Sequence, residues 1–443
     1  MELDTIMKKS MNVTLGLLSR VSGSERVKQW NLREPALNLV YQGMRHSVRA
    51  GNLVQSRFMA KKTLKPGEAL AKSTKPKKDL FDLSLTREQQ MVRDELIKFA
   101  KQEMRPLARD VENGIVPDNF FDQVNELGLA LSGVPEAIEG AGTVRSPVSG
   151  VLMAEDMAYG DMSLALAALS PLGFVNTLTE FGSRDQQSQY LPAFTGEKFI
   201  AATIALMEPR ARFNPNKLTT VAVPTNAGYR INGIKCMVPM GKKSEVMIVF
   251  ALLPGHGNRG FIIESHHPGI TTTLESNMGL SAAGMSRVVF EDVEVPKSAL
   301  LGESEVHYSH QRMLDLAKIG VCALSLGTCQ AVLDFVINYA NERIAFGEPI
   351  SNRQAVAFMI ADMAIELESM RMLTYRAAGR AEQGLSFHRE AYLAQMMCAQ
   401  RTMQIGTNGV QILGGHGFVC EYPVELWYRQ LRAIGILEGT LVV

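Results

Sequence analysis

The chain has 443 residues, of which 46% are hydrophobic and 21% charged, and its formal net charge is +1. This length allows two or three domains with sizeable cores, and the composition is that of an ordinary soluble protein. The chain contains no run of 18 apolar residues and does not open with a signal peptide, so we expect a protein that is soluble or peripheral to a membrane.

Positive charge is concentrated in the first 80 residues, which hold 16 Lys and Arg against 6 Asp and Glu. Pro35 is expected to begin a basic amphipathic helix. Residues 61–78 contain seven lysines and two prolines and are predicted to be a linker. We therefore predict that residues 1–80 form a basic extension, for which contact with an anionic membrane, a targeting role and a plain solvated segment all stay open. Nucleic-acid binding is not expected, because aromatic residues are not interleaved with the basic ones.

The five cysteines form an odd set with no Cys-x-x-Cys pair, which argues against a disulfide framework and favours a reducing compartment. We expect the cytoplasm, with the mitochondrial matrix or a membrane-peripheral location as alternatives. His416 and the adjacent His266 and His267 lack the ligand spacing of a metal centre, so no metal site is predicted.

The first domain is predicted to be helical. Apolar residues recur with helical spacing from Thr86 to Gly128, and hydroxyl caps at Ser84 and Thr86 come just before them. Further helices are expected over residues 147–192, with breaks near Pro171 and Gly182. These segments predict an N-terminal α-helical domain over residues 81–200.

Residues 200–300 have the pattern of strands instead. Residues 245–253 form a continuous apolar run typical of a buried strand, and residues 287–296 predict another. Asn232-Gly233 is typical of a hairpin turn. The pattern predicts a middle, barrel-like β domain over residues 201–305.

Helical periodicity returns after Gln311. Apolar residues recur at spacings of four and three from Cys322 to Ala340, and a second stripe runs from Val356 to Met370. We interpret both stripes, methionines included, as the packed core of a C-terminal four-helix bundle over residues 306–443. The predicted fold class is therefore α+β, in the order helices, strands, helices.

Three motifs near the C-terminus are informative through their order and spacing. They are Arg343-Ile-Ala-Phe-Gly347, Gln411-Ile-Leu-Gly-Gly-His-Gly417 and Glu438-Gly-Thr440. A carboxylate beside glycine-rich backbone suits a base that works next to a phosphate-bearing cofactor. With shorter matches such as Met278-Gly-Leu280 and Leu300-Leu-Gly-Glu303, residues 83–443 resemble the acyl-CoA dehydrogenases, flavoenzymes that remove two hydrogens from an acyl thioester.

This resemblance implies FAD as the cofactor and an acyl-CoA as the substrate, which would lose an α-proton to a carboxylate and a β-hydride to the flavin. Glu438 matches the family's base, and its backbone N–H would help to form the oxyanion hole. The family's other base position falls in Leu314-Asp-Leu-Ala-Lys318, where Ala317 stands in place of a carboxylate.

The resemblance also implies a set of cofactor-binding residues. Arg343 and Phe346 would approach the FAD of a neighbouring subunit, and Gln354 the same cofactor. Gln411, Gly414 and Gly415 would contact its pyrophosphate, Thr440 would lie near the adenosine diphosphate of the chain's own FAD, and Met207 would face the flavin. A homodimer or homotetramer is therefore implied, with an electron-transfer flavoprotein as the electron acceptor.

The chain departs from the family pattern beside the flavin. Met207-Glu-Pro-Arg210 lacks the family's hydroxyl residues, Met237 replaces a tryptophan, and Pro239 has no backbone N–H. These departures predict weakened FAD binding. They leave open a catalytically weak or inactive relative that binds acyl-CoA or a partner protein, and an enzyme for a non-thioester substrate. Only three residues follow Thr440, so a further expectation is that the sequence is a piece of a longer chain.

Overall fold

The structure is a computed structural model, and it describes residues 85–142, 145–302 and 308–443. All of these residues belong to one compact unit that begins at residue 78. The helix predicted from Pro35 and the linker predicted over residues 61–78 lie outside the described residues.

Helix α4 (Arg87–Phe99) begins at a hydroxyl cap, as predicted. The Thr86 side chain accepts a hydrogen bond from the Gln89 N–H, and the Gln89 side chain accepts one from the Thr86 N–H. This capping box satisfies two backbone donors at the start of the helix. The other N-terminal elements are η1 (Ala100–Met104), α5 (Arg105–Leu107), η2 (Asp110–Asn113), α6 (Asp118–Glu126), η3 (Leu131–Gly133), η4 (Glu136–Ile138), α7 (Pro147–Ala158), α8 (Met162–Phe181), α9 (Arg184–Tyr190) and η5 (Leu191–Thr195).

Helix α8 corrects one prediction, because Pro171 lies inside the helix and does not break it. Nearly all residues of α8 are buried, and the helix packs against α7, the long helix α10 (His310–Glu342) and strand β1 (Ala202–Ala205). This packing stabilises the helix enough to outweigh the roughly 3 kcal/mol that an interior proline costs. Gly182 ends the helix, as predicted.

The middle residues form a seven-stranded mixed sheet with the order β1-β4-β2-β3-β7-β6, in which β5 also pairs with β4. The apolar run predicted as a buried strand is β4, whose residues are buried at all but one position. The elements are β2 (Val221–Pro224), β3 (Gly228–Val238), β4 (Val246–Leu253), β5 (Gly257–Glu264), β6 (Ile270–Leu274), η6 (Ser281–Ala283), β7 (Ser286–Pro296) and η7 (Lys297–Ala299).

The hairpin predicted at Asn232-Gly233 is wrong, because β3 runs straight through both residues. Asn232 pairs with Val221 of β2, and the pairing of β3 with β7 shifts register at Gly233. A Cβ at Gly233 would lie 2.6 Å from the Thr220 Cα. The Asn-Gly pair therefore marks a bulge and a close approach of two backbones, which need glycine as a turn does.

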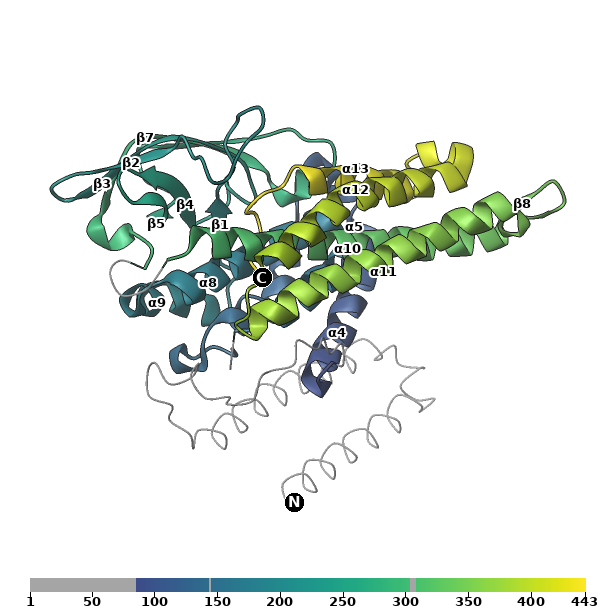
Figure 1. The fold of residues 1–443 in the computed structure, drawn as a ribbon, viewed down its shortest axis with the longest axis horizontal. Helices are drawn as coiled ribbons and strands as arrows, with labels where there is room; N and C mark the ends of the chain where they lie inside the picture. Colours follow the sequence, from purple (N-terminus) through teal and green to yellow (C-terminus); the bar gives the residue numbers. More distant parts are fainter. Residues whose placement is uncertain (1–84, 143–144, 303–307) are drawn as a thin grey trace, which may run out of the picture. The chain divides into compact units, whose positions relative to one another are not determined.

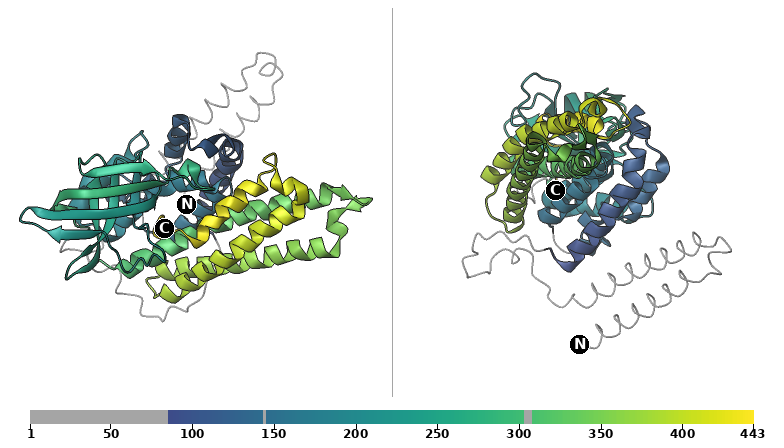
Figure 2. Two further views of the ribbon diagram at one scale, coloured as in Figure 1. Left: turned by 90° about the horizontal axis from the view of Figure 1, so that it is seen from above. Right: turned by 90° about the vertical axis from the view of Figure 1, so that its right-hand side faces the viewer.

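The C-terminal residues form the predicted helical bundle, whose long helices extend away from the sheet (Figures 1 and 2). The stripe from Cys322 to Ala340 is buried along α10, and the inner part of the second stripe, from Met363 to Met370, is buried on α11. The remaining elements are β8 (Ile344–Ala345), β9 (Glu348–Pro349), η8 (Ile350–Asn352), α11 (Gln354–Glu382), α12 (His388–Leu413), η9 (Gly414–Phe418), α13 (Val424–Leu431) and η10 (Arg432–Gly435).

Two described helices, α8 and α10, are long and apolar enough to cross a membrane by length and composition alone. Their most apolar stretches are 94% and 83% buried inside the protein, so we assign both helices to the core. Within residues 85–142, 145–302 and 308–443, no three His, Cys, Asp or Glu side chains are arranged to hold a metal ion.

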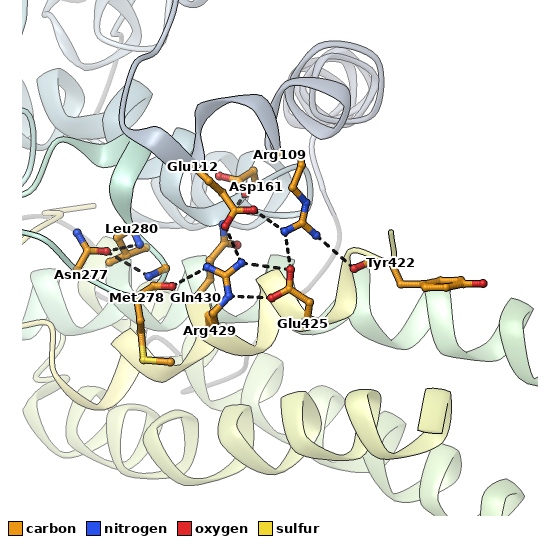
Figure 3. A network of polar contacts seen from close by, with 11 residues as sticks. Arg109, Glu112, Asp161, Asn277, Met278, Leu280, Tyr422, Glu425, Arg429 and Gln430 are labelled. Carbon is orange, nitrogen blue, oxygen red and sulfur yellow. Dashed lines mark hydrogen bonds and ion pairs between the residues drawn. The ribbon is translucent and has the colours of Figure 1, made fainter. Parts of the chain in front are cut away.

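A network of polar contacts joins three distant parts of the chain (Figure 3). Arg429 on α13 donates to Glu112 of η2 and to the Met278 carbonyl, both at 2.7 Å. Arg109, which precedes η2, pairs with Glu425 one turn earlier on α13. Because α13 leads directly into residues 432–443, the network fixes the path by which the last segment enters the core.

A buried ion pair joins β3 to the segment after β1. Lys235 Nζ lies 3.0 Å from Glu208 Oε1 and donates to the Leu206 carbonyl, and the two charged side chains are at most 1% exposed. Burial opposes the ionisation of Glu208, but the charge of Lys235 and hydrogen bonds from Thr219 and Thr220 lower its pKa to about 2. Burial lowers the pKa of Lys235 to about 8, which leaves it protonated at neutral pH. The pair therefore holds residues 206–208 against the sheet.

Replacing Lys235 with methionine should leave Glu208 charged and unpaired, and destabilise the protein by about 3–5 kcal/mol. The double variant Lys235→Met/Glu208→Gln should lose less stability than the single variant, because no buried charge is left alone. Urea unfolding at pH 7 measures both, and Lys243→Met, which removes a half-exposed lysine, serves as the control. Equal losses in the single variant and the control would contradict the assignment.

Candidate active site

Glu438 follows α13 and η10 and is half-buried beside the bundle. The Gln395 side chain on α12 donates a hydrogen bond to Glu438 Oε1 at 2.9 Å. The backbone N–H of Glu438 donates to the thioether sulfur of Met207 at 3.4 Å. Glu438 is thus held through its carboxylate by a helix of the bundle and through its backbone N–H by the segment that follows β1.

The surroundings of Glu438 suit a proton acceptor. Burial raises the pKa of the carboxyl group, and the Gln395 hydrogen bond and the positive charge of Lys318 on α10 offset part of that rise. A carboxylate whose pKa is raised accepts a proton more readily than one in water. The site therefore has the electrostatics expected of a general base.

Neither of the two residues that act on Glu438, Lys318 and Gln395, was predicted from the sequence as part of the site. Lys318 directly follows Ala317, which stands at the family's other base position. Its place beside that position is the signal from which a role near the site could have been predicted. Its amino group lies 3.4 Å from Asp315, which also bonds to His388 at 2.9 Å. Gln395 has no signal in the sequence, since it is one of many polar residues on an amphipathic helix.

The residues that directly follow Glu438 are all buried. Gly439 has a φ of +65°, and a Cβ there would lie 2.2 Å from Leu206 Cδ2, so this position needs glycine. Residues 441–443 are at most 1% exposed and lie against glycines of α7, α8 and α10. The Asn176 side chain on α8 donates to the Val442 carbonyl at 3.0 Å. Glu438 is therefore followed by a segment that belongs to the core.

A second group of predicted site residues lies at the outer end of the bundle, where the β8–β9 hairpin joins α10 to α11 (Figure 1). Arg343 follows the last residue of α10, Phe346 is 96% exposed in the hairpin, and Gln354 begins α11. The Tyr339 hydroxyl bonds to His416 at 2.8 Å and so joins this end of α10 to the end of α12. Gln411, Gly414 and Gly415 are exposed at that end of α12.

The structure thus divides the predicted residues into two groups. Met207 and Thr440 lie with Glu438, and the other six lie at the outer end of the bundle. Arg343 stands 25 positions after Lys318 along α10, which corresponds to about 38 Å at 1.5 Å per residue.

The stretch that departs from the family pattern is strained. Met237 and Met240 have positive φ angles of 50° and 54°, which are uncommon for residues with a side chain. The Met237 N–H donates to Glu275 at 2.7 Å, and the Met240 N–H donates to the Ala283 carbonyl at 2.8 Å. These bonds hold the backbone in its unusual conformation, of the kind that often occurs at functional sites.

The chain also matches models of a known protein family. Models of the N-terminal, middle and C-terminal domains of acyl-CoA dehydrogenase match residues 86–198, 203–293 and 307–443. The chain belongs to the acyl-CoA dehydrogenase family. It is therefore an oxidoreductase that acts on acyl-CoA, and FAD is the cofactor of its family.

Several members of the family resemble the chain over most of its length. An acyl-CoA dehydrogenase of Bacillus subtilis is 32% identical over 81% of this chain and 96% of its own length. The mitochondrial short-chain specific acyl-CoA dehydrogenase of Rattus norvegicus is 32% identical over 79% of this chain and 86% of its own. The structure of butyryl-CoA dehydrogenase from Megasphaera elsdenii superimposes with a TM-score of 0.75 at 30% identity, covering 81% of this chain and 96% of that one.

The residues present fit FAD, the cofactor of the acyl-CoA dehydrogenase family, at three places. The Arg343 guanidinium makes no ion pair within the described residues. A Cβ at Gly414 or Gly415 would meet nothing within 4 Å, so the backbone there is open to a ligand. The Thr440 hydroxyl is buried and has no hydrogen-bond partner among the described residues. Such free donors and open backbone suit a phosphate-bearing group.

Replacing Gln395 with leucine should raise the pKa of Glu438 further, because the variant loses a hydrogen bond to the ionised carboxylate. NMR titration of protein labelled at the glutamate side-chain carboxyl carbon measures this pKa, with the Glu438→Gln variant identifying the resonance. The control is Gln400→Leu, a change at an exposed position on the same helix. A lowered or unchanged pKa in Gln395→Leu would show that Gln395 does not stabilise the carboxylate.

Proposed function

We propose that the protein oxidises a short acyl-CoA thioester to its trans-2-enoyl form, with Glu438 as the base that removes the α-proton. The observation that carries this proposal is the placement of the Glu438 carboxylate. It is half-buried, it accepts a hydrogen bond from Gln395, and its pKa is raised by burial.

The chemistry requires a base and a polarised carbonyl group in one place. The α-proton of a thioester is only weakly acidic, so its removal depends on hydrogen bonds to the carbonyl oxygen where negative charge develops. Glu438 supplies the carboxylate from its side chain and an N–H from its backbone. FAD, when bound, supplies the acceptor for the β-hydrogen.

The six residues at the outer end of the bundle support a shared cofactor site. Arg343 and Gly414 lie too far along the bundle from Glu438 to serve the same FAD, yet both are exposed. We therefore infer that the outer end of one chain completes the FAD site of a second copy, in a homodimer or homotetramer. The exposed phenyl rings of Phe346 and Phe418, which are 96% and 88% exposed, suit such a contact.

A short acyl chain is favoured by the packing behind Glu438. Residues 441–443 are buried against α7, α8 and α10, so an acyl chain that extends past Glu438 in that direction would have to displace core side chains. The names of two relatives, a short-chain specific dehydrogenase and a butyryl-CoA dehydrogenase, point the same way.

We propose an electron-transfer flavoprotein as the electron acceptor, in keeping with the family. A reducing compartment, the cytoplasm or the mitochondrial matrix, suits the five cysteines, all of which are free.

A second candidate function is that of a catalytically weak or inactive relative. Such a protein binds acyl-CoA or a partner protein but does not oxidise acyl-CoA efficiently. It is favoured by Met207 and Met237, whose side chains offer no hydrogen-bond donor where the family pattern has a hydroxyl residue and a tryptophan. Purified protein with the absorbance of bound flavin supports the enzyme, and colourless protein that cannot be loaded with FAD supports the second candidate.

Glu438→Gln should leave folding and FAD binding intact but abolish the bleaching of the flavin by substrate, because glutamine cannot accept the proton. A loss of about 4 kcal/mol or more in the chemical step is expected if general-base catalysis contributes roughly 10²–10⁴-fold or more. Anaerobic mixing with acyl-CoAs from short to long, followed by flavin absorbance, measures the effect.

The control for this variant is Glu291→Gln, a change at an exposed position on β7. Bleaching of Glu438→Gln at the parent's rate would remove Glu438 as the base. An FAD-loaded parent that no acyl-CoA bleaches would overturn the dehydrogenase proposal.

Arg343→Ala should weaken FAD retention, because the forked guanidinium is the charged phosphate ligand expected at the outer end of the bundle. Fluorescence titration of the apoprotein with FAD measures the dissociation constant. Arg389→Ala is the matched control, since Arg389 is 80% exposed near the other end of α12. Equal affinity in both variants would count against the shared site.

A further inference from the structure

The backbone N–H of Glu438 already has an acceptor in this structure. It donates to the Met207 sulfur at 3.4 Å, and Met207 is only 7% exposed. The two residues are distant in the chain and meet where the segment after β1 passes the last segment. In the proposed function this N–H is the group that polarises the thioester carbonyl, so the sulfur occupies the place of the substrate oxygen.

The backbone of Met207 cannot move away easily. Its carbonyl accepts a hydrogen bond from the Cys236 N–H at 2.9 Å. On either side, the Leu206 carbonyl and the Glu208 carboxylate are both bonded to buried Lys235. Any motion that frees the Glu438 N–H must therefore come from the methionine side chain, whose three rotatable bonds and soft sulfur allow it.

Glu438 is fixed from its own side as well. Gly439 lies against Leu206, where a Cβ would be only 2.2 Å from the Leu206 side chain, and Gln395 holds the carboxylate. The direction of the Glu438 N–H is therefore set by the backbone packing. Of the two partners in this hydrogen bond, the Met207 thioether is therefore the one that can rotate away from the other.

We propose that Met207 is a positioning residue, whose thioether holds the Glu438 N–H in the resting site and yields it to the carbonyl oxygen of the bound thioester. The inference rests on the proposed function. A thioether is a weak hydrogen-bond acceptor and a carbonyl oxygen a strong one, so the exchange is favourable. A ligand that lacks the carbonyl leaves the sulfur in place, so only a ligand with the carbonyl bears the cost of displacing the sulfur from the N–H.

The first test compares two ligands that differ only in the carbonyl group, butyryl-CoA and S-butyl-CoA. Binding is measured in the Glu438→Gln background, which retains the backbone N–H but does not turn over. Adding Met207→Leu removes the sulfur at nearly constant volume. We expect butyryl-CoA to bind about two- to fivefold more tightly, which matches the strength of one weak hydrogen bond, and S-butyl-CoA to bind as before.

The matched control is Met240→Leu, which changes another buried methionine, in the strained stretch around Met237, and leaves the Met207 sulfur in place. It should alter the binding of neither ligand. Equal changes for butyryl-CoA and S-butyl-CoA in Met207→Leu, or no change for either, would overturn the inference.

The second test needs no ligand. Hydrogen exchange at the Glu438 amide, measured at single-residue resolution by mass spectrometry, should be faster in Met207→Leu than in the parent and in Met240→Leu. Equal protection in all three proteins would show that the sulfur does not hold the N–H. If the parent binds neither FAD nor acyl-CoA, the proposed function fails, while the exchange rates still decide whether Met207 holds this amide.

Discussion

The candidate site depends on how the chain on either side of Glu438 is buried. Leu437 precedes it in the core, and residues 441–443 follow it between α7, α8 and α10. The network around Arg429 fixes the approach of α13 to this segment. A flexible tail would lose much of its conformational entropy on placing a carboxylate accurately, whereas here that cost is already met by folding.

Much of the fold could be predicted from local signals. The cap at Thr86, the buried strand β4 and the stripes on α10 and α11 follow from periodicity and hydrogen-bonding side chains, which act over a few residues. The two errors, at Pro171 and at Asn232-Gly233, have a common cause. In each case contacts with segments distant in the chain outweigh a local preference, because burial stabilises α8 and pairing with two neighbours extends β3.

The site could be predicted in part, for a similar reason. Glu438 stands in a short motif, so it could be identified without knowledge of its neighbours. Gln395 lies on another helix, and its hydrogen bond to Glu438 depends on the packing of α12 against the last segment. The contact of the Met207 sulfur with the Glu438 N–H depends on packing across more than 200 residues, and no periodicity or motif records such a contact.

The separation of the two groups of site residues has a genetic consequence. If the outer end of one chain serves the cofactor site of its neighbour, a chain damaged only at Arg343 and a chain damaged only at Glu438 are each inactive alone. Mixed together, they would form pairs in which one of the two sites is intact. Alleles of these two kinds would therefore complement each other, and two alleles damaged within the same group would not.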